Sequence, residues 1–188
     1  MLGGRQQEAL AEYRRALEAD RLSPFVGSFI GFAYHLARRP REAERQLRQV
    51  IEMDSTFYLP HVFLGLTYAA AGDLGRSIAE VEIGTRQDGD LQGLAQKGYV
   101  YALAGRRADA ERVLQSLEER APGGYYPHYD AAAIHLALGD RERAFRGLGA
   151  AADEKSEALL LIQVDPRFDP LRRDPRFVAL VRRIWPLD

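Results

Sequence analysis

The sequence predicts an all-α fold of stacked antiparallel helix pairs, and three observations carry this prediction. A small residue followed three places later by a ring side chain recurs at spacings of 34, 33 and 34 residues, at Gly31, Gly65, Gly98 and Ala132. A second small residue follows each of these after twelve places, at Ala43, Ser77, Ala110 and Ala144. The segments between them carry apolar residues at helical spacing. A period of this length is typical of arrays of helix pairs.

Each repeat is predicted to contain two amphipathic helices. In the first full repeat, residues 28–38 and residues 41–53 each carry one apolar stripe, so each helix must bury one face. Small residues such as Gly31 and Ala43 let the two backbones approach, while Leu47 fills the space beside the crossing. Neither helix buries its stripe alone, which is why such pairs stack in arrays.

Turn residues set the expected domain boundaries. A half repeat, with a second helix only, is expected at residues 1–23, and four full repeats over residues 24–157. The four repeats span residues 24–57, 58–90, 91–123 and 124–157. Because the chain starts at an inner turn, we expect it to be the C-terminal part of a longer array. The unpartnered stripe at Leu10, Tyr13 and Leu17 is then expected to favour self-association.

Residues 158–188 break the period and are predicted to form a C-terminal cap. The tetrapeptide Asp-Pro-Arg-Phe occurs twice there, at residues 165–168 and 174–177. Asp174-Pro175 is a strong helix start, because Asp caps helices and Pro suits the first helical turn. The helix that follows has one apolar face, formed by Phe177, Leu180, Val181, Ile184 and Trp185. We expect this face to cover the last repeat.

The repeated pattern resembles the tetratricopeptide repeat (TPR), and the resemblance covers roughly residues 1–157. It implies a right-handed superhelical solenoid whose first helices line a concave groove that binds a peptide or partner segment. The tail resembles that of bacterial TPR modules attached to protein kinases, nucleotide cyclases and winged-helix regulators. That resemblance supports an alternative function, a regulatory or sensor domain of a larger bacterial signalling protein that binds a small molecule or an intramolecular peptide.

The resemblance also implies which first-helix residues face the groove. The candidates are Phe25, Ser28, Phe32, His35, Gln92, Gln96, Tyr99, Tyr126, Tyr129 and Asp130. Tyrosine offers a wide contact area with one polar tip, and glutamine offers both a donor and an acceptor to a peptide backbone. For Phe32 the alternative is burial between repeats.

One binding mode of this family is excluded. Its chaperone-binding members clamp a terminal carboxylate with Lys, Asn and Arg side chains on three successive first helices. The matching positions here are Ser28, Phe32, Phe63, Gln92 and Gln96. None is a cation, and a carboxylate is costly to desolvate without a charged partner.

Composition and motifs point to a non-catalytic interaction scaffold. The formal net charge of −1 gives no general attraction to nucleic acid or to an acidic membrane, so the expected partner is a protein or peptide. No apolar run is long enough to span a bilayer and no secretory pattern opens the chain, so we expect a cytoplasmic protein. There is no cysteine, and the histidines at 35, 61, 128 and 135 lack metal-ligand spacing. We therefore expect no catalytic residues, no metal and no cofactor.

Overall fold

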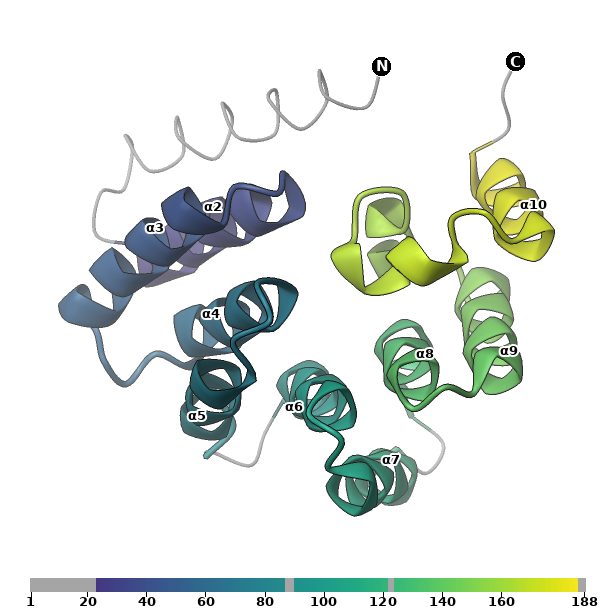
Figure 1. The fold of residues 1–188 in the computed structure, drawn as a ribbon, viewed down its shortest axis with the longest axis horizontal. Coiled ribbons are helices and arrows are strands. Elements are labelled where there is room, and N and C mark those ends of the chain that lie inside the picture. Colours follow the sequence, from purple (N-terminus) through teal and green to yellow (C-terminus); the bar gives the residue numbers. More distant parts are fainter. Residues whose placement is uncertain (1–22, 87–89, 122–123, 186–188) are drawn as a thin grey trace. The chain divides into compact units, whose positions relative to one another are not determined.

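The computed structural model of the chain describes residues 23–86, 90–121 and 124–185, and within these ranges it contains helices and no strand (Figure 1). Four helix pairs follow one another: α2 (Pro24–Leu36) with α3 (Pro40–Met53), α4 (Tyr58–Ala70) with α5 (Leu74–Gly84), α6 (Leu91–Leu103) with α7 (Arg107–Arg120), and α8 (His128–Ala137) with α9 (Arg141–Asp153). Two 3-10 helices, η1 (Glu157–Leu161) and η2 (Pro166–Leu171), and the helix α10 (Pro175–Ile184) complete the described chain. The predicted all-α fold of helix pairs with a C-terminal capping helix is confirmed.

The chain divides into two compact units, with the boundary between Gly93 and Leu94 inside α6. Unit 1 holds α2 to α5 and the first residues of α6. Unit 2 holds the rest of α6 and all that follows it. The half repeat predicted at residues 1–23 lies outside the described residues, apart from its last residue, Ser23.

Close contact at small residues holds each helix pair together. A Cβ built on Gly31 of α2 would overlap the side chain of Leu47 of α3, and a Cβ on Gly65 of α4 would lie 2.5 Å from Val81 Cγ1 of α5. Ser77 Oγ also donates a hydrogen bond of 2.7 Å to the carbonyl oxygen of Gly65. These contacts confirm that the recurring small residues mark the crossings of the paired helices.

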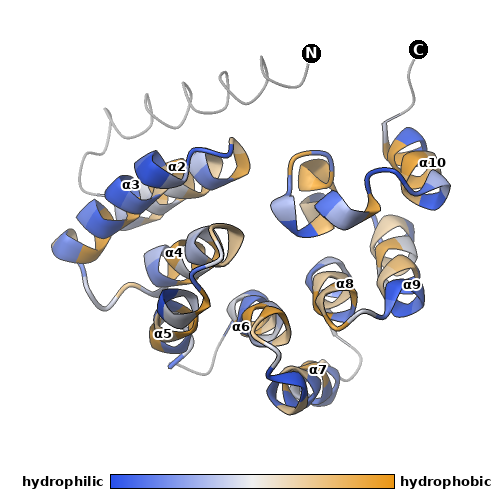
Figure 2. Ribbon diagram, in the orientation of Figure 1, coloured by the Kyte–Doolittle hydropathy of each residue, from blue (hydrophilic) through white to orange (hydrophobic). Residues whose placement is uncertain are grey.

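The second helix of the first pair, α3, buries one stripe of apolar residues and carries polar residues on its other faces. In α3 the buried residues are Ala43, Leu47 and Val50, at spacings of four and three residues. Figure 2 shows most of the remaining surface of α3 in the colour of hydrophilic residues. This single stripe is the pattern of a helix that packs on one side only.

The turns inside the pairs use left-handed backbone where the sequence predicts turns. Gly72, Gly105 and Gly139 have φ angles of 80°, 73° and 87°. Glycine adopts a positive φ at a helix end without the steric penalty that a Cβ carries. After two of these turns an aspartate caps the next helix: Asp73 Oδ1 accepts from the backbone N of Arg76, and Asp140 Oδ1 from that of Arg143.

The C-terminal segment closes the core of unit 2. Phe168, Leu171 and Phe177 are buried in one cluster with residues of α8 and α9, and Leu180, Val181 and Ile184 of α10 pack against that cluster. Asp174 Oδ1 accepts from the backbone N of Arg176, so the predicted start of α10 is confirmed. The last residue of the predicted apolar face, Trp185, follows α10 as its C-cap and is only half-buried.

Candidate partner-binding site

The ten first-helix residues predicted to line a groove differ widely in exposure. Phe25 and Gln92 are exposed, and Phe32, Tyr99 and Tyr126 are half-buried. The other five are buried, namely Ser28, His35, Gln96, Tyr129 and Asp130. The role of all ten in binding a partner stays a prediction.

Two of the buried residues in unit 1 have bonding partners inside the fold. Ser28 Oγ donates a hydrogen bond of 2.7 Å to the carbonyl oxygen of Pro24, one turn earlier in α2. His35 Nδ1 lies 3.5 Å from Thr67 Oγ1, which itself donates to the carbonyl oxygen of Phe63. These two side chains therefore serve contacts within and between α2 and α4.

The accessible part of the first helices in unit 1 is aromatic. The rings of Phe25, Phe29, Phe32 and Phe63 form a continuous series, which we call the aromatic cluster. Phe25 and Phe29 lie 4.7 Å apart between ring centroids, and Phe29 meets Phe63 edge-on at 5.6 Å. Phe32 stacks on Phe63 at 4.4 Å. Phe25 is 56% exposed and Phe29 and Phe32 are half-buried, so the cluster reaches solvent.

No charged residue interrupts these two helices. Neither α2 nor α4 contains an aspartate, glutamate, lysine or arginine. A peptide lying on this surface would therefore meet apolar and aromatic groups without a fixed charge, so charged side chains along it would lose hydration without gaining a partner.

In unit 2 the same helical register carries polar groups. Phe29 and Phe63 each lie two residues before the small residue of their repeat, and in the next two repeats this position is Gln96 and Asp130. Gln96 Nε2 donates a hydrogen bond of 2.9 Å to Asp130 Oδ1, although 34 residues separate them in the sequence. This first-helix position thus changes along the sequence from two aromatic rings to an amide and a carboxylate.

An arginine from the C-terminal segment fills the space in front of this polar pair. Arg167 Nη1 donates to Gln96 Oε1 and to Asp130 Oδ1, both at 2.7 Å. Its Nη2 and Nε donate to Asp165 Oδ2 at 2.7 and 2.9 Å. Tyr129 Oη donates to the same Asp165 oxygen at 2.9 Å. We call these five residues the Arg167 cluster, and all five are buried.

Aromatic rings enclose the guanidinium as well. Its Cζ lies 5.3 Å from the ring centroid of Tyr129, 5.9 Å from that of Phe168 and 6.0 Å from that of Tyr99. Rings at such distances attract a cation through their electron-rich faces. Hydrogen-bond acceptors and rings together therefore replace the water that a buried arginine loses.

The local sequence sets the position of Arg167. Asp165 caps η2 by accepting from the backbone N of Arg167 at 2.9 Å, and Pro166 stands in the first turn. Phe168, next in the chain, is buried with its ring 4.9 Å from that of Tyr129. A capped turn anchored by a buried ring points the intervening arginine at α6 and α8.

Charge and burial act in opposite directions on the two carboxyl groups. Burial raises the pKa of Asp130, and the attraction of Arg167 does not overcome this. Burial alone would also raise the pKa of Asp165, but the charge and hydrogen bonds of Arg167 outweigh it and lower that pKa. The pKa of Arg167 is raised by its carboxylate partners despite its burial. Arg167, whose Nε and Nη2 both donate to Asp165, is thus a buried charge held by a carboxylate of its own segment as well as by Asp130.

Sequence reasoning did not identify Arg167 or Asp165 as members of this site. Both lie in a segment whose Asp-Pro pattern predicts only a cap. A usable signal was present, because Gln96 and Asp130 are polar residues at a first-helix position that is aromatic in the two preceding repeats. A buried carboxylate such as that of Asp130 is costly unless a cation pairs with it, and Arg167 in the segment after the repeats is that cation.

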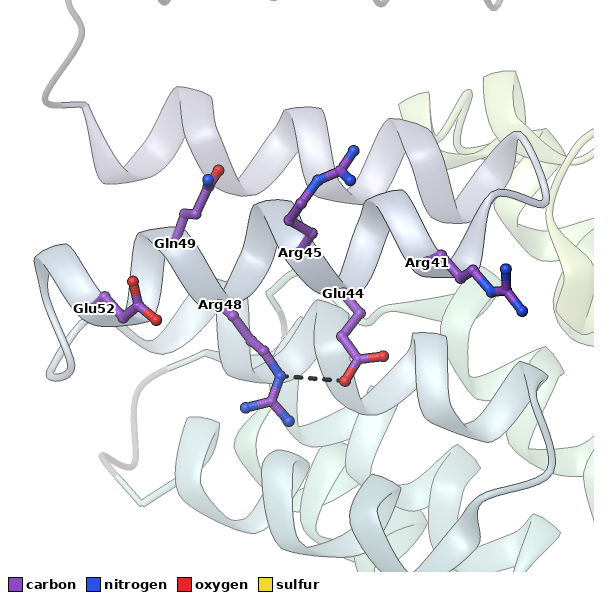
Figure 3. Close-up of a pocket in the computed structure, with 6 residues that line it drawn as sticks. All are labelled: Arg41, Glu44, Arg45, Arg48, Gln49 and Glu52. Carbon is purple, nitrogen blue, oxygen red and sulfur yellow. Dashed lines mark hydrogen bonds and ion pairs between the residues drawn. The ribbon is translucent and has the colours of Figure 1, made fainter.

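A shallow depression on α3 is a further surface feature (Figure 3). It is lined by Arg41, Glu44, Arg45, Arg48, Gln49 and Glu52. Glu44 Oε1 accepts from Tyr68 Oη at 2.7 Å and from Arg48 Nε at 3.2 Å. The Glu44 carboxylate thus already serves to join α3 to α4.

The described residues show no arrangement suited to metal chemistry. Across residues 23–86, 90–121 and 124–185, no group of three or more histidine, aspartate or glutamate side chains is placed to hold a metal ion. His61 Nδ1 contacts Glu80 Oε2 at 2.7 Å and His128 Nε2 contacts Glu154 Oε1 at 3.2 Å. The first pair links α4 to α5, and the second links α8 to the C-cap residue of α9.

Comparison with solved structures shows the fold family. The chain matches the crystal structure of TTC0263, a thermophilic TPR protein in Thermus thermophilus, with a TM-score of 0.66 and 20% sequence identity over 95% of this chain and 91% of that chain. Two crystal structures of MamA match at 17% identity over 85% of this chain, with TM-scores of 0.53 and 0.50 and coverage of 94% and 87% of their own chains. The predicted resemblance is confirmed: this chain has the TPR fold.

No protein-family model matches the sequence, and no curated protein matches it. In the part of the chain that the structure describes, no helix has both the length and the apolar character needed to cross a membrane.

Proposed function

We propose that this chain is a non-catalytic protein-interaction scaffold, and that the first-helix surface of unit 1 binds a peptide or partner segment through the aromatic cluster. The observation that carries the proposal is the series of four phenylalanine rings on α2 and α4, which reaches solvent at Phe25. Aromatic side chains in a water-accessible surface are frequent anchors of protein interfaces.

The chemistry of the surface defines the partner. Because α2 and α4 carry no charged residue, the bound segment is apolar or aromatic where it lies on them. Such a surface suits a protein or peptide and offers nothing to a phosphate backbone, whose binding depends on cationic side chains. We therefore propose a protein partner and neither nucleic acid nor a membrane. Self-association through residues 1–23 stays a prediction.

A second candidate function is regulation through an intramolecular peptide. One observation favours it: the chain's own residues 165–168 contact α6 and α8 at positions predicted to receive a ligand. In this alternative the C-terminal segment is the ligand of unit 2, and the chain acts as a regulatory domain of a larger signalling protein.

Peptide selection tests the main proposal without knowledge of the natural partner. A random peptide library displayed on phage is selected against the wild-type chain, and the affinities of synthetic versions of the enriched peptides are measured by fluorescence polarisation. Phe25→Ala combined with Phe32→Ala is expected to weaken binding by about tenfold or more, because loss of an aromatic anchor costs roughly 2 kcal/mol. Met53→Ala, which truncates another exposed apolar residue of unit 1, is expected to leave binding unchanged.

Two results would contradict the proposal. One is that the double variant, with unchanged circular dichroism, binds the selected peptides as well as the wild type does. The other is that Tyr99→Ala combined with Tyr126→Ala removes binding, which would place the site on unit 2.

A further inference from the structure

The members of the Arg167 cluster come from two parts of the chain, as the residues of a binding site and of its ligand would. Three of its members, Gln96, Tyr129 and Asp130, belong to α6 and α8, whereas Asp165 and Arg167 belong to the C-terminal segment. The hydrogen bond from Gln96 Nε2 to Asp130 Oδ1 does not involve the arginine, so the two acceptors hold each other in place. Two of the acceptors for the guanidinium, Gln96 Oε1 and Asp130 Oδ1, are therefore fixed by the repeat itself.

The geometry selects a guanidinium over an ammonium group. One nitrogen, Nη1, donates to two acceptors on the first helices, while Nη2 and Nε form a fork on one carboxylate. The rings of Tyr129 and Tyr99 lie within 6.0 Å of the central carbon. A planar group with donors in fixed directions meets these requirements, whereas a compact lysine ammonium cannot reach all the acceptors at once.

We propose that Gln96, Tyr129 and Asp130 of α6 and α8, together with Asp165 before η2, form a guanidinium-binding site, that Arg167 is its tethered ligand, and that the site takes an untethered guanidinium once the Arg167 side chain is removed. The ligand class is an arginine side chain, and in the intact chain the tethered copy excludes all others because its effective concentration is high. This site is separate from the aromatic cluster, and its test does not depend on the partner binding proposed for unit 1.

The chain contains a matched control for this proposal. The second Asp-Pro-Arg-Phe tetrapeptide also caps a helix with its aspartate and buries its phenylalanine. Its arginine, Arg176, instead stays exposed and pairs with Asp174 and with Glu142 at the surface. The two arginines stand in the same tetrapeptide but contact different groups. Arg167 is buried against Gln96 and Asp130, whereas Arg176 pairs with carboxylates at the surface.

Chemical rescue of Arg167→Ala tests the proposal in the full chain. The variant removes two methylene groups and the guanidinium, so ethylguanidinium has the shape of the lost atoms. We expect the melting temperature to fall by about 10 °C, because breaking a buried ion pair leaves carboxylates without a partner. Millimolar ethylguanidinium, at constant ionic strength, is expected to raise it again in a saturable manner.

Specific controls separate binding from general solvent effects. N-ethylurea, which is similar in shape but neutral, and ethylammonium, which is charged but not planar, are expected to give no recovery. Arg176→Ala is expected to lower the melting temperature by a few degrees at most and to show no recovery with any of the three compounds. Adding Asp130→Asn to Arg167→Ala is expected to abolish the rescue.

The outcomes decide the matter even if the variant does not fold. In that case the readout is recovery of helical circular dichroism on addition of ethylguanidinium. The proposal is overturned if ethylguanidinium produces no saturable recovery by either readout. It is equally overturned if Arg176→Ala responds in the same way, or if ethylammonium works as well.

Discussion

The substitution Phe168→Ala is expected to loosen unit 2 and to leave unit 1 intact. Phe168 is fully buried, and its ring lies 4.9 Å from that of Tyr129. It belongs to one cluster with buried residues of α8, α9 and α10, and every member of that cluster belongs to unit 2. Its removal therefore acts on the contact between the C-terminal segment and the last helix pair.

The expected magnitude depends on the cavity that the truncation leaves. Phenylalanine-to-alanine changes in cores cost about 3 to 5 kcal/mol, and the cost rises with the cavity that remains. Here the neighbouring residue is Arg167, whose guanidinium depends on η2 for its position, so the surroundings cannot relax into the cavity without breaking hydrogen bonds. We expect about 4 kcal/mol.

Hydrogen exchange with mass spectrometry locates the effect. In Phe168→Ala, amides of α8, α9 and η2 are expected to lose protection by several orders of magnitude, because each 1.4 kcal/mol corresponds to about a factor of ten. Amides of α2 to α5 are expected to keep wild-type protection, since repeat arrays lose stability from their ends. Leu160→Ala is the matched control, because Leu160 lies in the same C-terminal segment but is 58% exposed, and it should change little.

The reasoning is refuted by either of two patterns. A uniform loss of protection across both units would mean that the chain unfolds as one cooperative block. Unchanged protection of α8 and α9 would mean that the C-terminal segment does not stabilise the last helix pair.

Two further predictions concern helix packing and pH. In Gly65→Ala the new Cβ would lie 2.5 Å from Val81 Cγ1 and 3.1 Å from a backbone oxygen, so we expect a loss of about 1 to 3 kcal/mol in urea unfolding. In Gly75→Ala the new Cβ would lie no nearer than 3.9 Å to a neighbour, Asp73 Oδ1, so this change should be neutral or stabilising by up to about 1 kcal/mol. The pKa of Asp165 is lowered in the folded state, so its stabilising contribution is complete above its unfolded pKa of about 3.9 and is lost as the pH falls through the folded value. The urea midpoint of the wild type should therefore fall below about pH 4, and that fall should be smaller in Asp165→Asn; an equal fall in both would contradict the assignment.

The fold was predictable because its rules are local. A small residue at each crossing is required wherever two backbones approach closely, so the positions of Gly31 and Gly65 in the sequence already mark the pairs. Glycine at inner turns and the Asp-Pro start of α10 are likewise decided by a few neighbouring residues. The C-cap position of Trp185 shows the limit, since the apolar spacing continues past the point where the helix ends.

The site depends on contacts that the repeat period does not encode. Arg167 follows Asp130 by 37 residues and Gln96 by 71, and it comes from a segment outside the repeats. A periodic pattern predicts which face of a helix points outward, but not that the chain returns to cover that face. The sequence therefore predicted that Gln96, Tyr129 and Asp130 lie on an outward face of the first helices. It did not predict that Asp165 and Arg167 contact them.

The two Asp-Pro-Arg-Phe tetrapeptides separate what a short motif determines from what its surroundings determine. In both copies the aspartate caps a helix and the phenylalanine is buried, because these roles need only the local chain and a nearby core. The arginines diverge: Arg167 meets a buried carboxylate and is enclosed, whereas Arg176 lies over the ring of Phe145 at 4.0 Å and remains at the surface. It is therefore the polar first-helix position, Asp130, that turns a capping motif into a ligand, whereas the same position in the two repeats of unit 1 holds the aromatic rings of Phe29 and Phe63.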